Sequence, residues 1–223
     1  MSPVRSAIIL AGGKSTRMNE DKGLKELCGE PLVNHVIHRV SDHVNEILVV
    51  VGSEVQKDVY SGIVGDRVKL VIDLYDDGSP LVGALTGFSE AKGDYALVTG
   101  CDMPFISHKI IQYLFNAGEG RNGAVFRWPN GWVEPLLAVY RIKPSLDLAL
   151  DLYNSGNLKL RLMLLNMEDV DLVPIETLML MDPELMSLHD IDTAEALDTA
   201  EEVLKRDHVK KYKNISDLKL CLF

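Results

Sequence analysis

Short apolar runs of strand length, separated by amphipathic stretches, constrain the fold of this chain most strongly. Five runs are rich in β-branched, aliphatic or aromatic residues: Ala7–Leu10, Ile47–Val51, Leu70–Ile72, Tyr95–Val98 and Leu136–Tyr140. The first four show no alternation of polar and apolar residues, which is typical of strands buried on both faces of a mainly parallel sheet. We expect the last run, taken as Glu134–Tyr140, to be an antiparallel addition to the same sheet.

The stretches between these runs have helical periodicity. Apolar spacings of three and four residues predict a helix over Pro31–Val44, and Ser79–Ala91 and Ser107–Asn116 are helical as well. Such alternation predicts an α/β fold with a doubly wound, mostly parallel sheet and helices on both faces, Rossmann-like in outline.

Two further segments bear on the limits of this pattern. Residues Gly118–Pro129 are rich in turn formers and interrupt the alternation of strands and helices. Asp192 and Glu195 have the spacing of a capping box, so we expect a last helix that begins at Asp192 and runs to about Arg206. With no internal repeat, the sequence indicates one domain over residues 1–206 and a C-terminal tail, 207–223, of unassigned role.

Composition excludes several classes of function. Asp and Glu number 33 against 23 Lys and Arg, a net charge of −10 that argues against non-specific nucleic-acid binding. No apolar run approaches the roughly 20 residues that cross a bilayer, and the three cysteines form no Cys-x-x-Cys pair. We therefore expect a cytoplasmic protein with no membrane or nucleic-acid partner.

The segment directly after the first strand is the strongest functional signal. It reads Leu10-Ala11-Gly12-Gly13-Lys14-Ser15-Thr16-Arg17-Met18-Asn19-Glu20-Asp21-Lys22. Two glycines let backbone amides approach an anion closely, and three cations within nine positions suit a triphosphate. The Walker A pattern fails because Ile8 stands where it needs a glycine. A strand-to-helix turn with solvated charges is the alternative.

Acidic residues follow other predicted strands. Asp102 lies in Cys101-Asp102-Met103-Pro104 at the carboxyl end of a strand, where open α/β sheets bind ligands and where a carboxylate can hold Mg²⁺. Asp73 has a similar position after Leu70–Ile72, and Gly52 after Ile47–Val51 either admits a base or ends the strand. For both aspartates a turn or a helix cap is the competing interpretation.

Asp190 and Asp192 alternate in sequence, so both side chains can point the same way just before the last helix. One interpretation is a second metal-binding carboxylate, and the other is a plain N-cap. His189 beside them is a weaker candidate ligand.

Taken together, these motifs resemble those of the molybdenum cofactor guanylyltransferases. That family carries Leu-Ala-Gly-Gly-x-Ser-x-Arg-Met-Gly-x-Asp-Lys after its first strand, and this chain departs only at Asn19. Further segments match from about residue 6 to 206: Pro31–Leu32, Ser79–Gly83, Cys101–Pro104, Pro135–Tyr140 and Asp190–Glu195. Ser79 replaces a family glycine, and Asp190 and Asp192 replace asparagines, which looks closer to related cytidylyl- and sugar-nucleotide transferases.

The resemblance implies a nucleotide-diphospho-sugar transferase-like fold and transfer of GMP from Mg²⁺-GTP to molybdopterin bearing molybdenum or tungsten, with release of pyrophosphate. It implies catalytic roles for Arg17, Lys22 and Asp102, with Mg²⁺ on Asp102. Asp192 is a second candidate ligand from its position in the sequence alone. The implied nucleotide contacts are Leu10, Ala11, Gly12, Gly13, Ser15, Lys22, Gly52, Asp73 and Asp102. Other cofactor-biosynthesis proteins are candidate partners.

Two other functions remain open at this stage. The chain could act as a molybdopterin cytidylyltransferase or as a nucleotidyltransferase for another small phosphate or sugar phosphate. It could also be a nucleotide-binding regulatory module without turnover. Retention of Arg17, Lys22 and Asp102 together favours an active enzyme.

Overall fold

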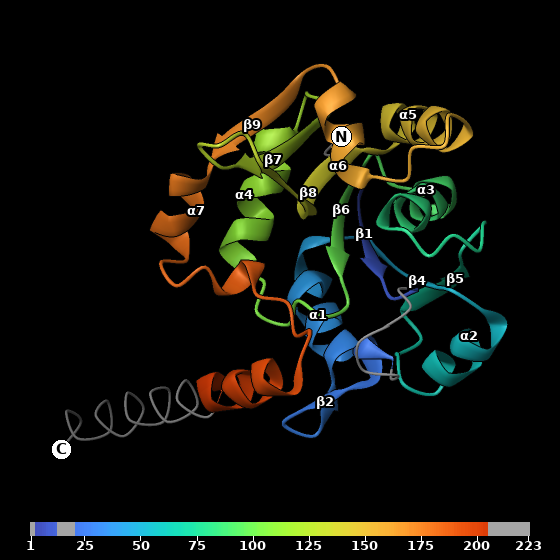
Figure 1. Ribbon diagram of the computed structural model, residues 1–223, viewed down its shortest axis with the longest axis vertical. Helices are drawn as coiled ribbons and strands as arrows, with labels where there is room; N and C mark the ends of the chain where they lie inside the picture. Colours follow the sequence, from blue (N-terminus) through green and yellow to red (C-terminus); the bar gives the residue numbers. More distant parts are fainter. Residues whose placement is uncertain (1–2, 13–20, 205–223) are drawn as a thin grey trace.

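A sheet of seven strands organises the computed structural model, which describes residues 3–12 and 21–204 (Figure 1). Its strand order is β5-β4-β1-β6-β8-β7-β9. The bounds are β1 Arg5–Leu10, β4 Glu46–Val51, β5 Val68–Ile72, β6 Tyr95–Gly100, β7 Gly123–Arg127, β8 Val133–Arg141 and β9 Val170–Pro174. A small antiparallel pair, β2 Glu26–Leu27 and β3 Glu30–Pro31, lies outside the sheet.

The first four strands of this order run parallel, as the sequence predicts. Ile8 of β1 stands in register with Leu48 of β4 on one side and Val98 of β6 on the other. Every residue of β6, and every residue of β4 after Glu46, is buried. Burial on both faces explains why these strands show continuous apolar runs rather than alternation.

The other half of the sheet is mixed. β8 pairs antiparallel with β6, which confirms the antiparallel addition, and β7 pairs antiparallel with β8. β7 lies inside the segment that we interpreted as turns, and that interpretation was wrong for these residues. Its first residue, Gly123, signals a turn in sequence, but a Cβ there would lie 2.6 Å from the Val139 carbonyl oxygen. The glycine therefore permits close approach of two strands.

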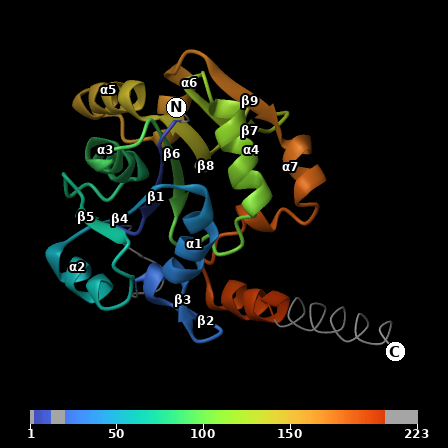
Figure 2. The ribbon, with the colours of Figure 1, turned by 180° about the vertical axis from the view of Figure 1, so that it is seen from behind.

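Helices cover both faces (Figures 1 and 2). They are α1 Leu32–Val40, α2 Glu54–Ser61, α3 Pro80–Glu90, α4 His108–Gly118, α5 Ile142–Asn154, α6 Leu160–Asn166 and α7 Ile175–Met181, with 3₁₀ turns at Lys22–Leu24, Ser41–His43 and Met186–Leu188. The predicted helices are confirmed with somewhat different bounds: α1 ends at Val40, where a 3₁₀ turn follows, and α4 continues two residues past the predicted end, to Gly118. The Ser79 hydroxyl caps α3 by accepting from the Val82 amide, with Pro80 in the first turn.

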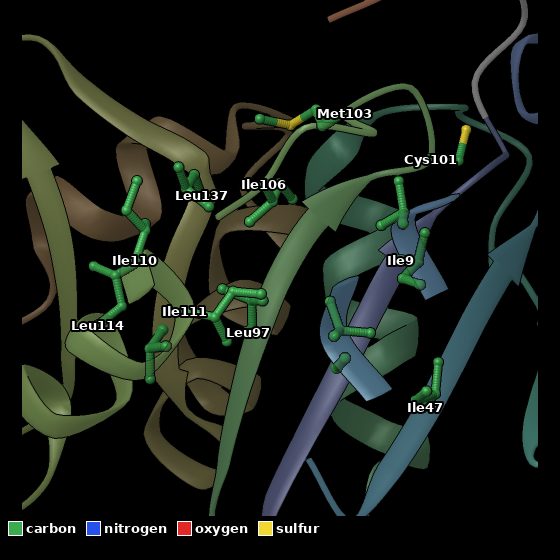
Figure 3. Packing of buried hydrophobic residues seen from close by; sticks show 14 of the residues in the cluster. Ile9, Ile47, Leu97, Cys101, Met103, Ile106, Ile110, Ile111, Leu114 and Leu137 are labelled. Carbon is green, nitrogen blue, oxygen red and sulfur yellow. The ribbon is translucent and has the colours of Figure 1, made fainter. Parts of the chain in front are cut away.

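Two apolar layers result from the alternation of side chains along the central strands. Ala7 and Ile9 of β1 belong to the layer that includes residues of α1, α4 and α7, whereas Ile8 belongs to the layer that includes residues of α3, α5 and α6. Figure 3 shows part of the first layer, including Ile9, Leu97 of β6 and Ile111 of α4. The described residues thus form the doubly wound arrangement expected from the sequence, and none of their helices is long and apolar enough to span a membrane.

The last helix is described over residues 194–204. Its N-cap is Thr193, whose hydroxyl accepts from the Ala196 amide at 3.1 Å. The prediction that Asp192 caps this helix was wrong, because the Asp192 carboxylate turns toward Lys22 instead. The expected end near Arg206, and the proposed tail, lie outside the described residues.

Candidate active site

The strand order changes direction at β1, which lies between β4 and β6. Such a switch point opens a crevice beyond the carboxyl ends of the strands. A cavity of about 200 Å³ lies there. It is lined by Leu10, Ala11, Gly12, Lys22, Val50, Asp73, Gly78, Ser79, Pro80, Gly83, Gly100, Cys101, Asp102 and Leu136.

One wall of the cavity is backbone held in close packing. The Ala11 amide donates to the Val50 carbonyl at 2.8 Å and thereby extends the pairing of β1 with β4. A Cβ on Gly12 would lie 2.8 Å from Asp73 Oδ2 and 3.1 Å from the Gly52 nitrogen. Close packing therefore favours glycine at position 12, and a Cβ on Gly52 would in turn lie 3.1 Å from the Gly12 carbonyl oxygen.

Asp73 contributes an unusual carboxylate to the same wall. Its Oδ1 is buried and makes no hydrogen bond to the described residues. Burial raises the pKa of Asp73 to about 6, and a hydrogen bond with Thr86 offsets part of this rise. Because Asp73 lines the cavity, its carboxylate is placed to accept a hydrogen bond from a ligand.

Lys22 and Asp102 face each other across the cavity floor. Lys22 Nζ donates to Asp102 Oδ2 at 3.1 Å and also to Asp192 Oδ1. Burial disfavours the ammonium group, but the hydrogen bond to Asp192 and the charge of Asp102 together raise the pKa of Lys22 above its ordinary value. Burial also raises the pKa of Asp102, although Lys22 opposes this effect.

Asp102, Asp190 and Asp192 form a cluster of carboxylates whose ligand atoms lie within 4.8 Å of one another. The backbone explains this convergence. Ile191 is buried, and its amide donates to the Asp102 carbonyl at 2.9 Å, so its two acidic neighbours are held next to Asp102. The prediction that Asp190 and Asp192 point the same way is confirmed, and within the described chain the cluster does not include His189.

This donor set fits a hard divalent cation. Mg²⁺ prefers carboxylate oxygens and is usually bound by one or two of them together with substrate phosphates. Asp102 and Asp192 are partly buried while Asp190 is exposed, so the cluster opens toward solvent and toward a ligand in the cavity. Lys22 neutralises part of its charge.

The structure brings together most of the residues named from sequence. Leu10, Ala11, Gly12, Lys22, Asp73 and Asp102 line one cavity, and Gly52 packs behind Gly12. Gly13, Ser15 and Arg17 lie outside the described residues. The sequence analysis did not identify Leu136 of β8 as a lining residue. Leu137 of β8 pairs with Thr99 near the carboxyl end of β6, so the preceding residue, Leu136, lies beside the cavity. Only the register of these antiparallel strands shows this, and the sequence does not give the register.

Comparison with known proteins identifies the family. The model of the MobA-like NTP transferase domain matches residues 7–168, which is most of the chain. The chain belongs to the MobA-like NTP transferase family. It is a nucleotidyltransferase. The matched region includes the glycine-rich segment after β1, Lys22 and Asp102.

Relatives of this MobA-like transferase have consistent names. A probable molybdenum cofactor guanylyltransferase of Natronomonas pharaonis is 31% identical over 202 residues, covering 90% of this chain and 98% of the relative. A molybdenum cofactor guanylyltransferase of Shewanella putrefaciens is 34% identical over 151 residues, or 63% of this chain and 70% of the relative.

Solved structures agree with the fold. Molybdopterin-guanine dinucleotide biosynthesis protein A from Archaeoglobus fulgidus superposes with a TM-score of 0.77 at 25% identity, covering 91% of this chain and all of that one. A 4-diphosphocytidyl-2C-methyl-D-erythritol synthase from Anaerococcus prevotii has a TM-score of 0.66 at 16% identity, covering 91% of this chain and 97% of that one, and shows the fold alone.

Proposed function

We propose that this MobA-like transferase transfers GMP from GTP to the terminal phosphate of molybdopterin bearing molybdenum or tungsten, and releases pyrophosphate. The observation that carries the proposal is the contact of Lys22 with two members of a cluster of three aspartates, beside a cavity at the switch point of the sheet. The names of the relatives support the choice of GTP and molybdopterin. We expect the reaction to occur in the cytoplasm.

The nucleoside would lie against the backbone wall. Leu10, Ala11 and Gly12 leave room for a flat base and the ribose, and Gly52, which packs against Gly12, adds no side chain there. Asp73 would accept a hydrogen bond from the nucleoside through its carboxylate, because this residue lines the cavity. Such a bond would favour the ionised carboxylate, which burial alone disfavours.

The phosphates would lie toward Lys22 and the aspartates. Mg²⁺ would be held by Asp102, with Asp192 and Asp190 at hand, and when bound it neutralises phosphate charge. In the free protein the Lys22 ammonium group pairs with the carboxylates of Asp102 and Asp192. Because Lys22 also lines the cavity, it would exchange these carboxylate oxygens for phosphate oxygens when a nucleotide binds. We assign Arg17 and the amides of Gly13 and Ser15 to the same phosphates from their places in the motif.

The chemistry asks little of the protein beyond positioning. An oxygen of the acceptor phosphate attacks the α-phosphorus of GTP, a new P–O bond forms, and the bond from the α-phosphorus to the bridging oxygen breaks. Pyrophosphate leaves with that electron pair. The attacking phosphate is already ionised, so no strong general base is required, and charge stabilisation dominates.

One feature keeps a cytidylyltransferase as the second candidate. Asp190 and Asp192 stand where the guanylyl family has asparagines, and both lie in the carboxylate cluster. These two aspartates add negative charge at the carboxylate cluster, where the phosphates would lie. They do not alter the backbone wall of Leu10, Ala11 and Gly12, against which the base would lie. We therefore keep GTP as the first choice.

Pyrophosphate release from each of the four nucleoside triphosphates, with Mg²⁺ and with or without molybdenum-bearing molybdopterin, tests the proposal. We expect release only with GTP and the acceptor together. Greater release with CTP would assign the protein to the cytidylyl branch. Tight nucleotide binding without release under any combination would indicate a regulatory module.

A further inference from the structure

Helix α2 sends two polar side chains to the segment that precedes Lys22. The Tyr60 hydroxyl is buried and donates to Asp21 Oδ1 at 2.8 Å. Gln56 Nε2 donates to the Ala11 carbonyl at 2.8 Å and to Asp21 Oδ2. Gln56 Oε1 accepts from the Gly52 amide at 2.6 Å. One helix therefore contacts the loops after β1 and β4 and the residue next to Lys22.

Asp21 transmits this contact to Lys22. It is the N-cap of the 3₁₀ turn Lys22–Leu24, and its Oδ1 accepts from the Gly23 amide at 3.0 Å. Gly23 has no side chain where the Tyr60 hydroxyl approaches, and a Cβ there would overlap that hydroxyl. The same carboxylate thus joins α2 to the turn from which Lys22 extends.

Packing alone does not require these polar groups. Tyr60 lies in the apolar layer, where a phenylalanine ring would fill the same space without a hydroxyl to satisfy. A buried hydroxyl adds stability only when it is bonded, and this one has a charged acceptor. The arrangement is therefore better explained by what it holds in place.

We propose that Gln56 and Tyr60 are positioning residues for Lys22 and act through Asp21. The expected effect of this positioning on turnover rests on the proposed function. A lysine side chain has large rotamer freedom, and a charge stabilises a transition state best when it is preorganised. Fixing the backbone at Asp21 sets the point from which Lys22 Nζ reaches Asp102 and Asp192. Gln56 also ties this point to the wall for the base.

The test compares Tyr60→Phe with Tyr95→Phe in the whole protein. Tyr95 is a fair control because it too is buried, and its hydroxyl makes comparable bonds at the opposite end of β6, to the Arg121 carbonyl at 3.1 Å and from the Gly120 amide at 3.0 Å. Two readouts are needed: kcat and KM for GTP, and the ¹³Cε resonance of Lys22 without nucleotide, assigned by its loss in Lys22→Met.

We expect Tyr60→Phe to lower kcat about tenfold, the factor that corresponds to roughly 1.4 kcal/mol, with KM for GTP little changed. The Lys22 resonance should shift or broaden. Tyr95→Phe should lower the melting temperature without either effect. Gln56→Leu removes the link to both loops, so it should displace the Lys22 resonance and raise KM as well.

The proposal is overturned if Tyr60→Phe and Gln56→Leu leave the Lys22 resonance as in the parent, or if kcat falls no more than in Tyr95→Phe. Failure of the proposed function gives a different result. The parent would then release no pyrophosphate from GTP, while the Lys22 resonance in the same variants would still decide whether α2 positions this lysine.

Discussion

Replacing Asp73 by asparagine separates the effect of this carboxylate on folding from its use in the site. The substitution keeps the shape of the side chain and removes its charge. Because burial raises the pKa of Asp73 from 3.8 to about 6, ionisation of this group opposes folding at neutral pH. The free protein should therefore become more stable when the charge is removed.

The magnitude follows from linkage between protonation and folding. A rise of about two units at 1.36 kcal/mol each corresponds to roughly 3 kcal/mol, and because the carboxyl is partly solvated we expect about 1–2 kcal/mol. The destabilisation develops as the pH rises from about 4 to about 6 and is complete above that. At pH 8 the gain in Asp73→Asn should raise the melting temperature by about 3–6 °C.

Urea unfolding of Asp73→Asn at pH 8 and near pH 4.5 tests this reasoning. The stabilisation should be fully present at pH 8 and fall to roughly a third near pH 4.5. The exposed Asp66 offers a control, and Asp66→Asn should change stability little at either pH. In contrast, GTP should stabilise the Asp73→Asn variant less than the parent, since the acceptor for the nucleoside is weakened.

An Asp73→Asn variant that is less stable than the parent at pH 8 would refute the argument, because it would mean that the ionised carboxylate has partners which satisfy it. A gain of equal size at both pH values would attribute the effect to something other than ionisation. Unchanged stabilisation by GTP would remove Asp73 from the nucleotide site.

Three further predictions concern the charged cluster. Lys22→Ala should lower kcat by about 10²-fold, because loss of one preorganised charge costs about 3 kcal/mol; a kinetic comparison showing parental turnover would contradict its role with the phosphates. Asp102→Asn should abolish Mg²⁺-dependent turnover and leave the circular dichroism spectrum unchanged, and a parental Mg²⁺ titration would reduce Asp102 to a turn residue. Asp192→Asn should change the rate only a few-fold, because Asp102 is the principal ligand, and an Asp192→Asn variant as inactive as Asp102→Asn would point to a metal site that depends on both carboxylates. The neighbouring Thr193 is the helix cap, so Thr193→Ala should cost about 1 kcal/mol of stability without affecting the rate.

The parts of the fold that could be predicted from sequence are those where burial leaves a strong pattern. β1, β4 and β6 are buried on both faces, so their apolar runs predict strands almost at their observed positions. β7 and β9 could not be predicted in this way. Residues Ala124–Phe126 of β7 are apolar and buried, but this short run lies among turn formers and was interpreted together with them. β9 lies at the edge of the sheet with half-exposed residues and has no continuous apolar run.

The site divides in the same manner. Lys22, Asp73 and Asp102 follow strands or lie in a glycine-rich motif, and parallel strands bring such positions to one edge. The role of Asp192 was misjudged in part, because Asp and Thr both form caps and only the backbone geometry shows that Thr193 does so. Gln56 and Tyr60 gave no signal, since their contacts to Asp21 join residues 35 and 39 positions apart.

Transfer of label from GTP tests the central claim most directly. The purified protein is incubated with Mg²⁺, molybdenum-bearing molybdopterin and GTP carrying ³²P at either the α- or the γ-phosphate. The account predicts that α-label enters a guanine dinucleotide product in equal amount to the γ-label released as pyrophosphate, and that Asp102→Asn abolishes both. Recovery of α-label only in GTP or free GMP, or incorporation of label from CTP instead, would contradict it.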